Sequence, residues 1–361
     1  MTDVAIFHPY MLNVKQPSTL YLEGQAGNHA SMKLKGDSVV RAALDSQVTR
    51  ESGWTKKSST AVTCEDMFAK CVENNQIFVP NSENTWNYES SLRHEIPKAK
   101  AAIKQSVNQD ILSAWNEKVR KLTMQGEFTQ LLIEEEESVT WQSIVRGLPR
   151  NIMSFCVKLA SNALPSPDNL RRWGKRVMAT CPLCSCPNGT LAHIINFCPV
   201  ALNQGRFTWR HDSILNFLFG QIKTVAPSDV EIYCDLAGHM INNAVIPQDI
   251  LVSNGFGSKP DLVIISRSHK RIALFELTCP LERNIHTANT YKREKYSGMQ
   301  SDLEDKGWKV FLMPYEVSSR GQILKTTKSS IIYTLKQFKI KIKAEQLHSK
   351  QLSKIALLFL I

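Results

Sequence analysis

The sequence has 361 residues and is 43% hydrophobic, which is enough to form the cores of two or three domains and excludes a chain that is unfolded throughout. Lysine and arginine number 44 against 33 acidic residues, and the formal net charge of +11 favours a polyanion such as nucleic acid as partner, although many basic chains bind nothing acidic. No segment approaches the roughly 18 apolar residues of a membrane-spanning helix, and the start MTDVAIFHPY lacks the pattern of a secretory signal, so we expect neither a membrane nor secretion.

The first part of the chain, residues 1–90, shows little hydrophobic periodicity and is rich in Ser, Thr, Asn and Gly. Cys64 and Cys71 have no recognisable metal-binding spacing. We assign no function to this part, and partial disorder is one interpretation of its composition.

Residues 91–178 are expected to form a helical, basic linker region. An apolar residue recurs every three or four positions, which predicts an amphipathic helix packed in a core; the stripe consists of Ile103, Val107, Ile111, Trp115, Val119 and Leu122. Four consecutive glutamates, residues 134–137, are expected to be solvated. A second helical stretch covers residues 140–164 and ends at the loop-forming PSPDN.

The segment LRRWGKR, residues 170–176, surrounds one aromatic residue with four cations: Trp173 lies among Arg171, Arg172, Lys175 and Arg176. Such a cluster can pair with phosphates and stack on a base or sugar. A solvated helix end explains the same residues, so the pattern leaves both interpretations open.

The segment CPLCSCPNGTLAHIINFC, residues 181–198, contains four of the nine cysteines. In a reducing compartment, clustered thiols more often bind metal than form disulfides. Cys181 and Cys184 have C-x-x-C spacing, and His193 and Cys198 complete a CCHC set for tetrahedral zinc. All four positions are protein side chains, which predicts a structural zinc and places the chemistry elsewhere.

Two details of this zinc site can be predicted further. On an α-helix, residues five apart project about 140° apart, so we expect His193 at a helix end and Cys198 in the loop that follows it. Cys186 is a spare thiol that could replace Cys184, although C-x-x-C is the better-attested spacing.

Residues 257–284 predict a hairpin of two apolar strands, DLVIIS and RIALFELT, joined by the polar loop RSHK. With this loop, Ser266 lies opposite Arg271 and, counting back, Asp261 lies opposite Glu276 with Cβ atoms about 5 Å apart. A divalent cation could then bridge the two carboxylates. A loop of odd length would put them on opposite faces, and two solvated carboxylates at strand ends are the alternative.

Pro260 and Asp261, then fourteen residues, then Glu276 within an apolar strand, is the spacing of PD-(D/E)xK nucleases. Those enzymes hold Mg²⁺ with two carboxylates and use a lysine to orient or activate water. This chain has Thr278 where that lysine is expected. Residues 284–302 look helical and carry Lys292 and Lys295, either of which could supply the missing lysine, although two lysines on a helix are more often solvated.

The order of these features resembles the C-terminal part of the polyprotein of non-LTR retrotransposons that carry a restriction-like endonuclease. The resemblance covers residues 92–361 and rests on LRRWGKR, the CCHC cluster, GRFTWRHDSIL, KPDLV, FELTCPLE, KREKY and MPYEVSSRGQI, in that order. It implies an α/β fold with a helical N-terminal part, a CCHC zinc knuckle with its linker at 179–215, and a PD-(D/E)xK-like endonuclease domain at 216–345. That domain would have a central mixed sheet flanked by helices, followed by a tail at 346–361.

The resemblance also implies roles. Asp261 and Glu276 would hold catalytic Mg²⁺, with Lys292, or as second choice Lys295, assisting the water. The enzyme would nick target DNA to expose a 3′ hydroxyl that primes reverse transcription. The zinc knuckle, LRRWGKR and Arg210 would contact DNA or the RNA of the element. A reverse transcriptase partner, or a parent polyprotein, and a nuclear location are implied, with the cytoplasm as the alternative.

Members of that family carry a reverse transcriptase with paired aspartates before this region, whereas this chain has no Asp-Asp dipeptide, so no polymerase activity is expected from it. The chain can be a fragment of a degraded element, a separate reading frame or a domesticated remnant. The rival function is a catalytically silent, nucleic-acid-binding remnant. A zinc-stabilised interaction module without nucleic acid is a third interpretation, but it leaves the carboxylate pairing unexplained.

Overall fold

The computed structural model describes residues 3–35, 37–49, 59–79, 85–135, 138–236, 245–251 and 259–342. The chain forms two compact units, Ile6–Lys121 and Leu122–Ile361, the latter together with Met1–Ala5. The predicted tail, residues 346–361, lies outside the described residues. Within the described part of the chain, no helix combines the length and the hydropathy that crossing a membrane requires.

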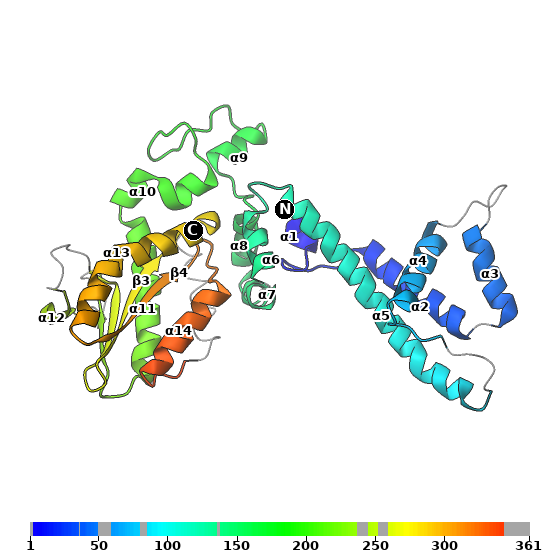
Figure 1. Cartoon of the computed structure of the whole chain (residues 1–361). Helices are drawn as coiled ribbons and strands as arrows, with labels where there is room; N and C mark the ends of the chain where they lie inside the picture. Colours follow the sequence, from blue (N-terminus) through cyan, green and yellow to red (C-terminus); the bar gives the residue numbers. More distant parts are fainter. Residues whose placement is uncertain are drawn as a thin grey trace. The chain divides into compact units, whose positions relative to one another are not determined.

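The first unit is helical. After the short α1 (Asp3–Phe7), it contains α2 (Pro17–Lys35), α3 (Ser38–Thr49), α4 (Ser59–Glu73) and the long α5 (Thr85–Arg120) (Figure 1). The stripe predicted for this helix is confirmed in part as core packing: Ile103, Val107 and Val119 are buried, Ile111 and Trp115 are half-buried, and Leu122 lies beyond the end of α5. Ile103 and Val107 share one apolar cluster with residues of α2 and α4.

Residues 1–90, whose sequence shows little hydrophobic periodicity, contain α2, α3 and α4. The buried face of α2 consists mainly of small residues, Ala26, Gly27 and Ala30, together with His29. Such residues give a weak hydrophobic period even though they allow close helix packing. Cys64 and Cys71 lie two helical turns apart on α4 and are buried in the same core. Apolar packing therefore accounts for these two cysteines without a metal.

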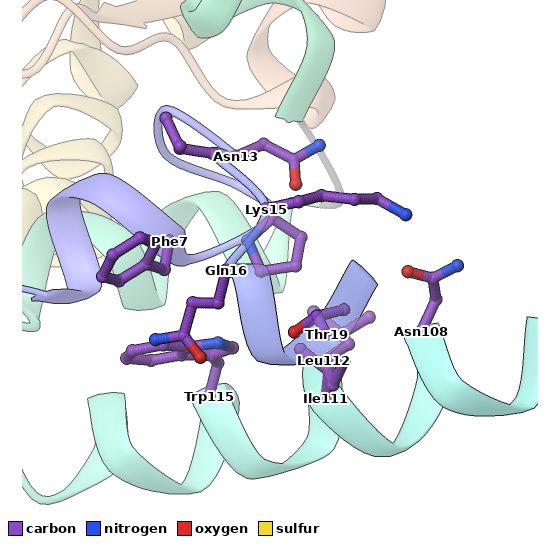
Figure 2. Close-up of a pocket in the computed structure, with 11 residues that line it drawn as sticks. Phe7, Asn13, Lys15, Gln16, Thr19, Asn108, Ile111, Leu112 and Trp115 are labelled. Carbon is purple, nitrogen blue, oxygen red and sulfur yellow. The ribbon is translucent and has the colours of Figure 1, made fainter. Parts of the chain in front are cut away.

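A cavity of about 370 Å³ belongs to this first unit and lies beside α5 (Figure 2). The Phe7 and Trp115 rings line it with centroids 6.2 Å apart, and Asn108 adds an amide. Lys15, also in the lining, forms an ion pair with Glu23 at 2.5 Å. The cavity contains none of the predicted site residues.

The second unit begins with a run of short helices: α6 (Glu127–Glu134), α7 (Ser138–Arg146), α8 (Arg150–Ala160), α9 (Pro167–Arg172), the π-helical turn η1 (His193–Phe197), α10 (Pro199–Asn203) and then the longer α11 (Arg206–Val225). The single helical stretch predicted at 140–164 is divided into α7 and α8, because Pro149 is extended at ψ 146° and caps α8. The predicted linker region 91–178 also divides between the two units at Leu122.

A mixed four-stranded sheet of order β1-β2-β3-β4 forms the rest of the second unit. β1 (Glu231–Cys234), β2 (Leu262–Ser266) and β3 (Arg271–Thr278) are antiparallel, whereas β4 (Lys309–Glu316) is parallel to β3. The crossover between β3 and β4 is made by η2 (Glu282–Asn284) and α13 (Ile285–Asp305), and the remaining helices are α12 (Gln248–Leu251) and α14 (Lys325–Gln337). The predicted mixed sheet flanked by helices is therefore present.

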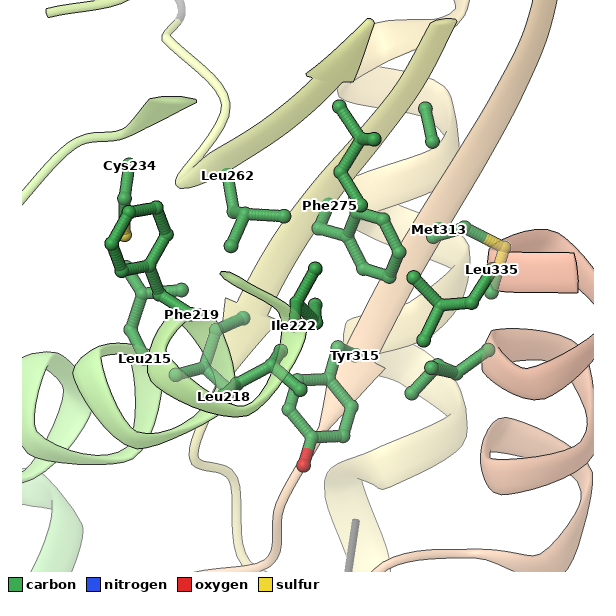
Figure 3. Close-up of a cluster of buried hydrophobic side chains, with 14 of the residues drawn as sticks. Leu215, Leu218, Phe219, Ile222, Cys234, Leu262, Phe275, Met313, Tyr315 and Leu335 are labelled. Carbon is green, nitrogen blue, oxygen red and sulfur yellow. The ribbon is translucent and has the colours of Figure 1, made fainter. Parts of the chain in front are cut away.

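Each face of the sheet packs against helices. On one face, α11 and α14 contribute Leu218, Phe219 and Leu335 to a large cluster that includes Phe275 and Tyr315 of the strands (Figure 3). On the other face, Tyr296, Met299 and Leu303 of α13 cover Val263, Ile265, Ile272 and Leu274. This two-sided burial accounts for strands that read as continuous apolar runs rather than as alternating ones.

Candidate functional site

The four predicted zinc ligands come together in the structure. One ligand atom from each of Cys181, Cys184, His193 and Cys198 lies within 4.8 Å of the other three, and Cys184 Sγ is 3.2 Å from His193 Nε2. Zinc bonds of about 2.3 Å to sulfur and about 2.0 Å to nitrogen put tetrahedral ligand atoms about 3.5–3.8 Å apart, so the spacing fits the ion. Cys186, the alternative ligand, lies outside this set.

The π-helical turn explains how His193 and Cys198 reach the same ion. A π-helix is closed by hydrogen bonds between residues five apart, so it brings such residues to the same side, which an α-helix does not. His193 begins η1, and Cys198 follows in extended conformation as the cap of α10. Thr190 Oγ1 accepts the main-chain N–H of His193 at 3.1 Å and fixes the start of the turn. Cys198 lies after the helical turn, as predicted, but His193 begins that turn rather than ending a helix.

The loop between the two ligand pairs passes close to the first pair at Gly189. Its N–H donates to Ala179 O at 2.6 Å, and a Cβ at this position would lie 2.7 Å from that oxygen and 3.0 Å from Cys181 N. Both neighbours are main-chain atoms that cannot rotate away. Only glycine fits here without moving the C-x-x-C pair.

We expect Gly189→Ala to lower the free energy of unfolding of the zinc-loaded protein by about 1–3 kcal/mol, since the added methyl group must displace main chain. Gly220→Ala is the matched control, because nothing lies within 4 Å of a Cβ at this position of α11. Alanine there should be neutral or stabilise the helix by up to about 1 kcal/mol. Urea unfolding of both variants measures the difference, and equal stability would contradict the tight fit at Gly189.

The basic segment before the zinc cluster is exposed. Trp173 is 46% exposed just beyond α9, and Lys175 and Arg176 are also exposed. Arg171 and Arg172 both pair with Asp168, at 3.1 and 3.0 Å, but retain exposed side chains. The segment therefore exposes an aromatic face and several cations. This agrees both with nucleic-acid binding and with a solvated helix end.

Arg210 does not have the role predicted for it. Its side chain is 2% exposed, and its guanidinium donates to Ile195 O at 3.0 Å, to Asn196 Oδ1 at 3.2 Å and to Cys279 O at 3.3 Å. A guanidinium enclosed by such acceptors cannot reach a phosphate in solvent. We therefore assign Arg210 to the packing of the zinc segment against the end of β3.

The register of the β2–β3 hairpin agrees with the four-residue loop. Ser266 pairs with Arg271 and Leu262 with Phe275, which is the last pair of the ladder, so one further step in the same register would bring Asp261 opposite Glu276. The partners of the two carboxylates nevertheless differ. Asp261 Oδ2 accepts the Leu277 N–H at 2.7 Å.

Glu276 is held by α13. Its side chain is almost fully buried, with Lys292 Nζ at 2.5 Å and Lys295 Nζ at 3.3 Å from Oε1. Tyr296 donates to Oε2 at 2.7 Å, and burial together with the charge of Glu276 raises the pKa of Tyr296, so the phenol stays protonated. Both candidate lysines therefore reach the carboxylate, Lys292 at the shorter distance. Thr278 Oγ1, at the position of the missing lysine, is buried with no hydrogen-bond partner among the described residues.

His211 of α11 was missed in the sequence and lies beside Asp261. Its Nε2 is 3.2 Å from both Asp261 Oδ2 and Leu277 O, and its Nδ1 is 3.0 Å from Asp212 Oδ1. Burial lowers the pKa of His211, but the hydrogen bonds to Asp212 and Asp261 outweigh it and raise the pKa to about 11. The ring is then an imidazolium that donates from both nitrogens. Asp261 Oδ2 and Leu277 O thus both accept from the His211 imidazolium at the end of β3.

The family comparison bears on the zinc-binding region. Residues 123–204 match the family described as zinc-binding in reverse transcriptase. The matched stretch contains all four clustered ligands, so the chain carries a zinc-binding domain of the kind associated with reverse transcriptases. A search among curated proteins gave no match. The match supports one part of the resemblance, namely a protein associated with the reverse transcriptase of a retroelement.

Proposed function

We propose that the protein is a Mg²⁺-dependent DNA endonuclease of a non-LTR retrotransposon, with a PD-(D/E)xK-like centre built from Asp261, Glu276 and Lys292. The observation that carries the proposal is the hairpin register, whose last pair is Leu262 with Phe275, so that one further step would bring Asp261 opposite Glu276, while Lys292 Nζ lies 2.5 Å from Glu276. A buried carboxylate on a strand that meets two lysines of the next helix combines the residue types needed for hydrolysis of a phosphodiester.

The donor atoms fit magnesium rather than a softer metal. Asp261 and Glu276 offer carboxylate oxygens, and Leu277 O lies beside Asp261. His211 Nε2 is 3.2 Å from both Asp261 Oδ2 and Leu277 O, so Mg²⁺ would have to displace this ring to bind these two oxygens. Magnesium prefers such oxygen ligands. When bound, it would polarise the phosphate and lower the pKa of the attacking water. Lys292 would orient that water and stabilise charge, with Lys295 as the second choice.

DNA would be held mainly by groups outside this centre. The exposed Trp173 and the cations of residues 171–176 lie within the matched zinc-binding region, before its first ligand Cys181, and the net charge of +11 favours a polyanion. We extend this proposal to the RNA of the element, to a reverse transcriptase as partner or parent polyprotein, and to the nucleus as location.

The test is nicking of supercoiled plasmid by the full chain loaded with zinc. We expect open-circle product with Mg²⁺ and none when EDTA is added just before the reaction. Cleavage that continues equally without divalent cations would contradict the proposal, as would a failure to cleave at any Mg²⁺ or Mn²⁺ concentration.

One observation favours the rival, a catalytically silent binding remnant. Glu276 is already paired with two lysines and Asp261 with His211, so protein cations neutralise both carboxylates. Such a remnant would bind DNA with steep salt dependence, through phosphate contacts, and would need no Mg²⁺. Salt-sensitive binding without cleavage in the same plasmid assay would favour it.

A further inference from the structure

The zinc-binding segment is attached to the end of β3 by buried polar contacts. Asn196, in the π-helical turn that begins with His193, donates to Cys279 O at 3.0 Å. Arg210 reaches the same carbonyl at 3.3 Å and also holds Ile195 O and Asn196 Oδ1. Two side chains, one from η1 and one from α11, therefore converge on one carbonyl just beyond β3.

The next residue of α11 makes the corresponding contact with the carboxylate site. His211 donates to Leu277 O, and Leu277 in turn donates its N–H to Asp261. Neighbouring residues of one helix thus bind the zinc segment and the end of β3 that positions Asp261. Leu277 and Cys279 are two residues apart, so a displacement of one carbonyl is passed directly to the other.

We propose that Arg210 and Asn196 are positioning residues that make the geometry at Asp261 dependent on an intact zinc site. The assignment of Asp261 to a cation site rests on the proposed function, but the coupling itself is a statement about structure. Zinc fixes His193 and hence the turn that presents Ile195 O and Asn196 to Arg210. Once that turn is lost, a buried guanidinium loses its acceptors Ile195 O and Asn196 Oδ1, and the end of β3 loses the Asn196 donor.

Because Arg210 is buried, loss of the zinc site is expected to disturb the end of β3 rather than leave it unchanged. Arg210 is 2% exposed, and its guanidinium donates to the carbonyls of Ile195 and Cys279, while burial lowers its pKa. A buried charge without partners forces nearby groups to move or admits water. The guanidinium contacts the segment from Leu277 to Cys279 through the Cys279 carbonyl, at 3.3 Å.

Hydrogen exchange of the full chain, measured over peptides covering 275–280 with and without bound zinc, tests the coupling. We expect zinc removal to accelerate exchange there about tenfold or more, while peptides from the centre of β2 change much less. Exchange at 275–280 that is unchanged, or that rises equally throughout the sheet, would overturn the proposal.

Two variants make the test independent of zinc removal. Asn196→Ala and Arg210→Met, both loaded with zinc, should show the same local acceleration at 275–280. Arg206→Met is the matched control, since Arg206 lies on the exposed start of the same helix. If Asn196→Ala behaves like this control, the attachment does not position β3. Asn196→Ala keeps the buried arginine and so serves even if Arg210→Met fails to fold.

The coupling and the nuclease can fail separately. A protein that never cuts DNA but shows the zinc-dependent exchange retains the coupling and loses the proposed function. A protein that cuts DNA while exchange at 275–280 ignores zinc retains the function and loses the coupling.

Discussion

Replacing Cys181 with serine is expected to remove the bound zinc and unfold the segment from residue 181 to about residue 204. One apolar cluster of this segment has Cys181, Cys198 and Ala201 as its buried members, with Phe207 of α11 packed against them, and Leu191 and Ile195 are buried as well. Two of the three cluster members are metal ligands, so this cluster depends on the ion. In zinc-finger peptides, structural zinc contributes an apparent binding free energy of about 10–16 kcal/mol, most of which becomes folding energy.

Zinc content by mass spectrometry and limited proteolysis measure this effect. The control is Cys186→Ser, because Cys186 belongs to the same loop but not to the ligand set. That variant should bind one zinc ion and resist protease like the unmodified chain. Full zinc content in Cys181→Ser, or loss of zinc in Cys186→Ser alone, would show that the ligand set is wrong.

Asp261→Asn and Glu276→Gln are expected to reduce Mg²⁺-dependent nicking by about 1000-fold or more, since a catalytic metal supplies several kcal/mol of transition-state stabilisation. DNA affinity should remain nearly unchanged, because binding is assigned to exposed cations elsewhere. Initial rates and filter binding at one salt concentration measure the two quantities. Asp305→Asn, at the exposed end of α13, is the control acid.

The two variants differ in their risk to the fold. Glu276→Gln leaves Lys292 and Lys295 without their shared carboxylate, and breaking such a buried pair can cost about 3–5 kcal/mol. Asp261 is more accessible and pairs with a histidine, so Asp261→Asn is the cleaner change. Equal losses of DNA affinity and of cleavage in Asp261→Asn would make this residue structural.

Local spacing explains what could be predicted. The zinc ligands lie within eighteen residues, and the register of the hairpin depends on a loop of four, so counting along the chain was sufficient. The helices of residues 1–90 were not recognised because α2 buries alanine and glycine, which carry almost no hydrophobic signal.

Long-range contacts explain what could not be predicted. His211 meets Asp261 across fifty residues, and Arg210 meets Cys279 across sixty-nine, so neither pairing has a spacing that can be counted. Their only signal was the run RHD within GRFTWRHDSIL, in which the arginine could equally bind a phosphate or form buried hydrogen bonds between elements. Burial decides between these, and burial of a single arginine on an amphipathic helix is not visible in the sequence.

The most direct test of the carboxylate site is Mn²⁺ binding followed by electron paramagnetic resonance on the zinc-loaded protein, beside its Asp261→Asn variant. Mn²⁺ accepts the same oxygen ligands as Mg²⁺ and reports binding without any need for DNA or turnover. We predict a saturable Mn²⁺ site that Mg²⁺ displaces and that Asp261→Asn abolishes. Identical Mn²⁺ binding by both proteins, or none by either, would contradict a cation site at Asp261 and Glu276.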